Sequence, residues 1–124
     1  MKKLKNVEIP STVAVIGKYA FMNCSNLENA DLSKAGITEL ESGVFAQCTS
    51  LKTVSLPDGL LSVNGEFGVN GGAFSHCSAL NAVSLPDSVE TIGVTAFRGC
   101  TRLATINDTD ATEWLTDNGF KGAL

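Results

Sequence analysis

Hydrophobic residues recur along this chain in one repeated pattern. The stretch from Leu80 to Leu103 shows it most completely, with apolar residues at Val83, Leu85, Val89, Ile92 and Phe97. The same order of residues begins upstream at Leu51, Leu27 and Leu4. A repeat in the low twenties of residues predicts a solenoid, in which successive coils stack and share one core.

A Phe-x-x-Cys motif marks each copy, and a leucine follows each cysteine by three residues. The motif residues are Phe21 and Cys24, Phe45 and Cys48, Phe74 and Cys77, and Phe97 and Cys100, with cysteine intervals of 24, 29 and 23 residues. We expect these rings and thiols to fill the core, with the cysteines reduced and stacked as small apolar residues. Four cysteines also allow disulfides, but parallel side chains on neighbouring coils lack the required dihedral geometry.

The copies share an LxxVxLP-like segment whose apolar and polar residues alternate, as in a β-strand; the second copy is the most divergent. In the fourth copy this points Val83 and Leu85 inward and Ala82 and Ser84 outward. Successive copies are therefore expected to form a parallel sheet with about 4.8 Å between strands. Because proline has no N–H to donate, the strands should end at Pro10, Pro57 and Pro86. The AFxxC segment is long enough for a single α or 3₁₀ turn only.

The copies span about residues 4–26, 27–50, 51–79 and 80–102, and a C-terminal strand and cap span 103–124. The second copy is the loosest, with Ala30 in place of a β-branched residue and Ser33 in place of proline. The third copy carries about six extra residues, Glu66 to Gly71. Insertions in solenoids leave the coil as loops on one face.

The segment after Leu103 breaks the pattern. Asp110 is expected to cap a short helix that ends at Gly119. The helix should cover the open face of the last coil with Trp114, Leu115 and Phe120.

The consensus LxxVxLPxxVxxIGxxAFxxCxxL resembles the BspA-like class of bacterial and protist leucine-rich repeats, over about Leu4 to Ile106. The matching positions include Gly17, Ala20, Phe21 and Cys24 in the first copy and Gly93, Ala96, Phe97 and Cys100 in the fourth. The resemblance implies an α/β-type leucine-rich-repeat solenoid that is mostly β, coils right-handedly, and has a parallel sheet on one face and short α or 3₁₀ turns on the other. Residues 1–124 would form a single domain, either a short protein or, as we expect, a segment of a longer one.

The composition and charge of the chain disfavour two classes of binding partner. The chain is 44% hydrophobic and 18% charged with a net charge of −4, and its basic residues cluster only at Lys2, Lys3 and Lys5. Nucleic acid and anionic membranes are therefore poor partners. No apolar run approaches the roughly 18 residues of a membrane span. The N-terminus has no apolar region of the kind that follows the charged start of a signal peptide.

The residues that could carry chemistry have simpler interpretations. His76 adjoins Cys77, but neighbouring residues in a tight turn point in different directions, so we expect an exposed histidine rather than a thiol–imidazole pair. Cysteine intervals above twenty residues do not fit a zinc site. Asp108 and Asp110 lack the further ligands of a calcium loop and fit a helix cap. We predict no enzyme activity, cofactor or metal.

Two regions are candidates for partner binding. The first is the insertion, which offers Glu66, Phe67, Val69 and Asn70; the alternative is a tolerated loop that folds back on the coil. The second is the outward face of the strands, which presents short polar residues such as Asn29, Asp31, Thr53, Ser55 and Ser84.

The resemblance also implies a function. BspA-like repeats are often secreted or on the cell surface, and family members include adhesins for host extracellular proteins. We therefore expect a non-catalytic protein-binding or adhesion module. The alternatives are a structural spacer and a glycan-binding module, for which only Trp114 and Tyr19 could stack on a sugar. Because the first coil lacks an evident cap, end-to-end self-association through the Leu4 edge is also expected.

Overall fold

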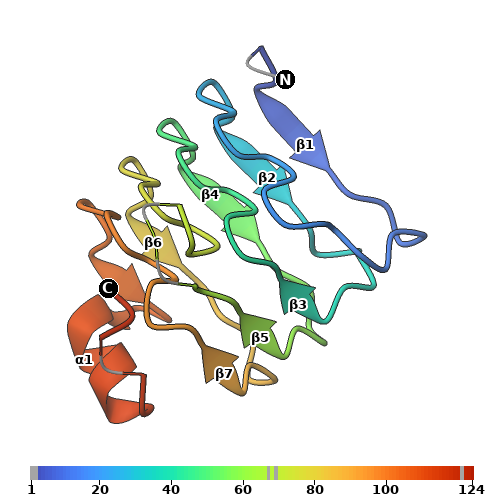
Figure 1. Ribbon diagram of the computed structural model, residues 1–124. Coiled ribbons are helices and arrows are strands. Elements are labelled where there is room, and N and C mark those ends of the chain that lie inside the picture. Colours follow the sequence, from blue (N-terminus) through green and yellow to red (C-terminus); the bar gives the residue numbers. More distant parts are fainter. Residues whose placement is uncertain (1–2, 67, 69, 121) are drawn as a thin grey trace.

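The protein forms a β-solenoid of about four coils (Figure 1). The computed structural model describes residues 3–66, 68, 70–120 and 122–124. The second, third and fourth coils each pass through two short strands and one tight turn, whereas the first coil has, among its described residues, only the strand β1; helix is confined to the C-terminal end of the described chain.

The first side of the solenoid carries the strands predicted from the LxxVxLP segments. Strands β1 (Asn6–Glu8), β2 (Asn29–Asp31) and β4 (Thr53–Ser55) pair in parallel, with Val7 opposite Ala30 and Ala30 opposite Val54. Strand β6 (Ala82–Val83) lies beside β4 and pairs in parallel with β8 (Thr105–Ile106). The register is the one in which equivalent positions of successive copies face each other, so the predicted alignment of the copies is confirmed.

A second parallel sheet was not predicted. Strands β3 (Glu39–Leu40), β5 (Ser62–Val63) and β7 (Thr91–Ile92) pair in order, and Leu40, Val63 and Ile92 share one register position. Each strand is only two residues long. Two residues are too few to show an alternation of apolar and polar positions in the sequence. Each strand is nevertheless stable, because the equivalent strand of the next coil supplies the backbone hydrogen-bond partners that an isolated strand would lack.

The third side consists of the AFxxC turns. Within a turn the cysteine N–H donates to the phenylalanine carbonyl three residues earlier, as from Cys48 to Phe45 at 3.1 Å. Between turns the phenylalanine N–H donates to the next coil, from Phe45 to Ala73 at 2.8 Å and from Phe74 to Ala96 at 2.9 Å. The turns are thus single i to i+3 turns, linked into a ladder along the solenoid.

The residue before each cysteine has a left-handed backbone. Its φ is 63° at Asn23, 61° at Gln47, 60° at His76 and 77° at Gly99. This region is costly for most side chains and is favoured by glycine and asparagine. The requirement explains why this position holds polar or small residues and never a β-branched one.

The core follows the repeat. Phe45, Phe74 and Phe97 are buried, whereas Phe21 at the first coil is partly buried. The four rings stack in sequence, with centroids 5.6, 5.7 and 5.4 Å apart. All four cysteines are buried as free thiols. Aromatic and thiol side chains therefore form two continuous rows through the shared core.

The C-terminal segment starts with a hairpin that the sequence analysis missed. Strand β9 (Thr109–Asp110) pairs antiparallel with β8, and the two turn residues Asn107 and Asp108 have φ of 52° and 61°. Positive φ at both turn residues is the signature of a type I′ hairpin, for which Asn and Asp are preferred. The Asp108 and Asp110 pair therefore serves a turn and a helix cap.

Helix α1 (Ala111–Asp117) confirms the predicted short helix. The Asp110 side chain accepts a hydrogen bond from the Glu113 N–H at 3.0 Å, and Gly119 follows the helix with a φ of 85°. Leu115 is buried, and Trp114 is half-buried.

The chain then resumes the repeat. The Phe97 N–H donates to the Ala123 carbonyl at 2.9 Å, and the Ala123 N–H donates to the Phe120 carbonyl at 3.2 Å. The preceding coil makes the two equivalent bonds: the Phe74 N–H donates to the Ala96 carbonyl, and the Ala96 N–H donates to the Gly93 carbonyl. Phe120 and Ala123 thus have the hydrogen bonding of a fifth turn, and α1 lies in the chain between β9 and this turn.

Candidate functional site

The outer face of the β1-β2-β4 sheet gathers most of the predicted surface residues. The Asn29 amide donates to the Asn6 side chain at 2.7 Å, and the Thr53 hydroxyl donates to the Asn29 side chain at 2.5 Å. These bonds join the equivalent positions of three coils into one polar row. Asp31 and Ser55 lie in the adjacent column, and a shallow hollow of about 360 Å³ lies over both columns.

Asp31 has a structural partner of its own. Its carboxylate accepts hydrogen bonds from the Ser33 N–H at 2.9 Å and the Ser33 hydroxyl at 2.6 Å, which lower the pKa of Asp31. In the third copy the equivalent residues are Ser55 and Pro57. The Asp31–Ser33 turn therefore lies at the position where the other copies have proline. It explains why the second copy has Ser33 there instead of proline.

Ser84 is exposed but does not line this hollow. It follows β6, in the same column as Asp31 and Ser55, which continues to Asn107. The Asn107 side chain accepts a hydrogen bond from the Leu85 N–H of the neighbouring coil at 2.7 Å. The polar row of the first three coils would continue through Ala82 and Thr105, and Ala82 has no polar side chain to extend it.

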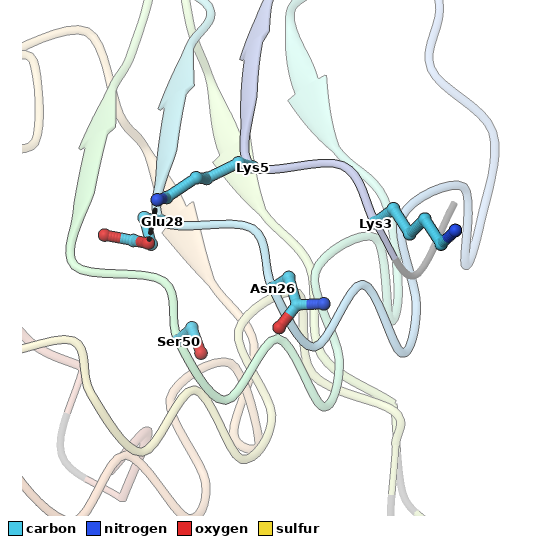
Figure 2. Close-up of a pocket in the computed structure, with 5 residues that line it drawn as sticks. All are labelled: Lys3, Lys5, Asn26, Glu28 and Ser50. Carbon is cyan, nitrogen blue, oxygen red and sulfur yellow. Dashed lines mark ion pairs between the residues drawn. The ribbon is translucent and has the colours of Figure 1, made fainter.

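A second hollow, of about 330 Å³, lies beside the start of the first sheet (Figure 2). Glu28 forms ion pairs with Lys5 at 3.5 Å and Lys52 at 3.9 Å, again across equivalent positions of three coils. Figure 2 shows Lys5 reaching toward Glu28, whereas Lys3 lies on the opposite side of Asn26. The alternation of Lys, Glu and Lys at one repeat position could have revealed this row from the sequence.

The described residues of the insertion pair as a small hairpin whose two arms are residues 64–66 and 70–73. Gly65 and Gly72 form an antiparallel bridge, and the Glu66 N–H donates to the Gly71 carbonyl at 3.0 Å. A β-carbon at Gly72 would collide with the Thr95 carbonyl oxygen, so this position needs glycine. The hairpin base is packed directly against the fourth coil.

The described residues of the insertion contact three other coils, two through side chains and one through a backbone carbonyl. Glu66 forms an ion pair with Lys18 at 3.0 Å, and the Asn70 side chain accepts a hydrogen bond from Gln47 at 3.1 Å. The Thr95 hydroxyl donates to the Glu66 carbonyl at 2.6 Å. The hydrogen bond and charge of Lys18 lower the pKa of Glu66. Glu66 and Asn70 thus have structural partners, while Phe67 and Val69 lie outside the described residues.

The cysteines make hydrogen bonds that the repeat pattern did not indicate. The thiols of Cys48, Cys77 and Cys100 each donate to the phenylalanine carbonyl of the preceding coil, at 3.1, 3.1 and 3.0 Å. A leucine in this position would fill space but could not donate. Each thiol thus joins two coils as well as packing in the core.

Burial makes these thiols poor nucleophiles. It raises the pKa of Cys48 and of Cys100 to about 12, and the pKa of Cys77 well above its ordinary value. A thiol nucleophile reacts as the thiolate, which these groups do not form near neutral pH. His76 is half-buried beside Cys77, and its ring lies over Gly99 of the next coil.

Two further features of the described residues concern metal binding and membrane-spanning helices. Among the described residues, no group of three His, Cys, Asp or Glu side chains is placed to hold a metal ion. Over the same residues, none of the helices has the length and hydropathy to cross a membrane.

Solved structures of bacterial leucine-rich repeat proteins resemble this chain. A leucine-rich cell surface protein from Faecalibacterium prausnitzii is 27% identical with a TM-score of 0.63, over 94% of this chain and 35% of that one. The T. pallidum leucine-rich repeat protein is 27% identical with a TM-score of 0.59, over 84% and 58%. A leucine-rich repeat protein from Eubacterium ventriosum is 28% identical with a TM-score of 0.58, over 96% and 36%.

This chain therefore spans between 35% and 58% of the length of these three proteins. No curated protein matches it. The family described as BspA type leucine-rich repeat region (6 copies) matches residues 1–67 and 67–123. With the repeat pattern, the stacked coils and the family match in agreement, the chain belongs to the BspA-type leucine-rich repeat family.

Proposed function

We propose that this chain is a non-catalytic protein-binding module and that the outer face of the β1-β2-β4 sheet is its binding surface. The observation that supports this is the polar row Asn6–Asn29–Thr53, held in register across three coils beside Asp31 and Ser55. Because the row is fixed by hydrogen bonds and a rigid sheet, a partner would order few side chains on binding. Such preorganisation reduces the entropic cost of association.

Family and relatives support the same class of function. Leucine-rich repeat modules commonly mediate protein interactions, and one structural relative is described as a cell surface protein. We propose that this chain acts at a cell surface as an adhesion module and that its partner is an extracellular protein of a host. The buried thiols, with their raised pKa values, agree with a function that involves no catalysis.

The test is capture of purified extracellular matrix proteins by the immobilised chain. Thr53→Arg and Ser55→Arg place long charged side chains on the face and should weaken capture at least about tenfold through steric overlap. Ser25→Arg and Thr101→Arg change exposed residues of the turns and should leave capture unchanged. Equal loss in all four variants would contradict a specific face, and absence of capture by the unmodified chain would favour the spacer function.

The insertion can be separated from the face in the same assay. Phe67→Ala with Val69→Ala removes its apolar side chains while keeping Glu66 and Asn70, which have partners in the fold. If capture depends on the sheet face alone, this double variant should bind like the unmodified chain. A loss as large as that of Thr53→Arg would move the binding surface to the insertion.

A further inference from the structure

A pocket lies where α1 meets the fourth coil. It occupies about 340 Å³ between the turn at residues 86–90 and the helix, and none of the residues lining the β1-β2-β4 hollow takes part in it. Figure 1 shows α1 beside the last coils at the C-terminal end of the solenoid. The helix takes the place of regular repeat structure here, and α1 and its C-cap contribute Trp114 and Asn118 to the pocket.

One wall of the pocket is aromatic. Trp114 and Phe120 both line it, with ring centroids 6.1 Å apart and ring planes inclined by 20°. The pair is fixed by the helix end, because Gly119 turns the chain and the Phe120 N–H donates to the Leu115 carbonyl at 2.7 Å. Both side chains are half-buried, so each retains contact with solvent.

The other wall is acidic. Asp87 and Glu90 line the pocket, both are exposed, and no basic side chain among the described residues lines it. Within the described chain neither carboxylate forms an ion pair, in contrast to Glu28 and Glu66. The Asn118 amide also lines the pocket and donates to the Trp114 carbonyl at 2.8 Å, which leaves its oxygen as an acceptor.

We propose that this pocket binds a lysine or arginine side chain of a protein partner. An organic cation gains energy from the electron-rich face of Trp or Phe, and two carboxylates can accept its charged hydrogen bonds. The pocket thus supplies both an aromatic wall and the opposite charge. This proposal extends the proposed protein-binding function by naming a feature of the partner, and it concerns a surface separate from the β1-β2-β4 face.

The repeat provides an internal comparison. Asp58 occupies in the third copy the position that Asp87 has in the fourth, and Leu61 occupies that of Glu90. Asp58 is exposed like Asp87 but does not line the pocket with the aromatic pair. Asp58→Asn is therefore a matched control: it removes the same charge from the same repeat position.

Trp114 is the single tryptophan of the chain, so its indole N–H gives one assignable NMR signal. The probes are N-acetyl-arginine amide and N-acetyl-lysine amide, with N-acetyl-glutamine amide as the uncharged control. We expect both cations to shift the Trp114 signal saturably with a dissociation constant on the order of millimolar, and glutamine amide to leave it unchanged. Added salt should weaken the effect, because the carboxylates are exposed.

Asp87→Asn with Glu90→Gln should weaken cation binding at least about fivefold, whereas Asp58→Asn should not change it. Absence of a saturable shift, or equal binding by the double variant, would overturn the proposal. A shift caused by neutral oligosaccharides and unaffected by the double variant would also overturn it and assign the pocket to glycans. Because no partner protein is used, failure here leaves the sheet-face proposal standing, and loss of matrix-protein capture leaves this one standing.

Discussion

The Phe-x-x-Cys turns and the hairpin at residues 64–73 both have to pair their backbone groups, and they do so with different partners. In the turns of the first three coils each phenylalanine N–H donates to the carbonyl of the residue just before the next coil's phenylalanine, as from Phe45 to Ala73. In the hairpin the bonds run within the insertion, from Glu66 to Gly71, or come from a particular side chain such as Thr95. The bonding of the turns can recur in every added coil. The bonding of the hairpin depends on the particular residues that surround the insertion.

This difference has an energetic consequence. A residue in the turn ladder contacts its equivalents on both sides, so its loss disturbs two interfaces between coils. A residue in the hairpin instead contacts particular residues of other coils, as Glu66 contacts Lys18, and most of these contacts lie at the surface. It belongs to no ladder that repeats from coil to coil. Substitutions in the ladder should therefore cost several times more stability than substitutions in the hairpin.

The largest effect is expected at the middle of the aromatic stack. Phe74→Ala removes a buried ring that stacks on Phe45 and Phe97, and it should lower the free energy of unfolding by about 3–5 kcal/mol. Phe21→Ala removes a partly buried ring with one stacking neighbour and should cost clearly less. Urea unfolding of both variants measures this. Equal losses would contradict a core shared between coils.

High pH should destabilise the thiol row. Because burial raises the pKa of Cys48, Cys77 and Cys100 in the folded state, the unfolded chain loses these protons first as the pH rises. The stability that comes from the protonated thiols is complete below the unfolded pKa and is lost as the pH rises through the folded pKa. Between pH 7 and 10 the free energy of unfolding should fall by about 2 kcal/mol for each thiol.

A single variant isolates this term from other groups that titrate at alkaline pH. Cys77→Ala should retain about two thirds of the thiol-dependent fall while losing stability at neutral pH. Unfolding curves at both pH values give the comparison. A fall unchanged by Cys77→Ala would attribute the alkaline effect to other groups.

A smaller effect is expected where the hairpin meets the fourth coil. Thr95→Val removes the donor to the Glu66 carbonyl at a buried position and should cost about 1 kcal/mol. Amide hydrogen exchange in the hairpin should also become faster. Thr101→Val, at an exposed turn position, is the control and should change neither quantity.

The smallest effect is expected at the Lys18–Glu66 ion pair. Both side chains are exposed, so solvent and salt screen their attraction. Glu66→Gln should therefore leave the urea midpoint within error of the unmodified chain, as should Lys18→Gln. A large loss in either would show that the hairpin supports the solenoid more than its contacts indicate.

The repeat predicted those features of the fold that depend on equivalent positions. The period placed Val7, Ala30 and Val54 in one register, and a single cap residue, Asp110, predicted the start of α1. The second sheet could not be recognised, because a pair such as Thr91–Ile92 is too short to show periodicity. The Asn107–Asp108 turn carries a recognisable hairpin signal, but the acidic spacing of Asp108 and Asp110 draws attention to a helix cap instead.

The candidate sites were less predictable. The sequence identified Asn29 and Thr53 as outward residues, but only the structure shows the hydrogen bonds that join them to Asn6. It identified the insertion without indicating that Glu66 would reach Lys18, which is 48 residues earlier in the chain. Contacts between irregular segments depend on the path of each loop, and no period encodes that path.

All four copies keep one phase, and every cysteine is buried in a single core. Reaction with an aromatic disulfide reagent at neutral pH tests this most directly, because it counts accessible thiols. We expect almost no reaction in the folded protein and four reactive thiols after denaturation in urea. Rapid reaction of the folded protein, or fewer than four thiols after denaturation without reductant, would contradict it.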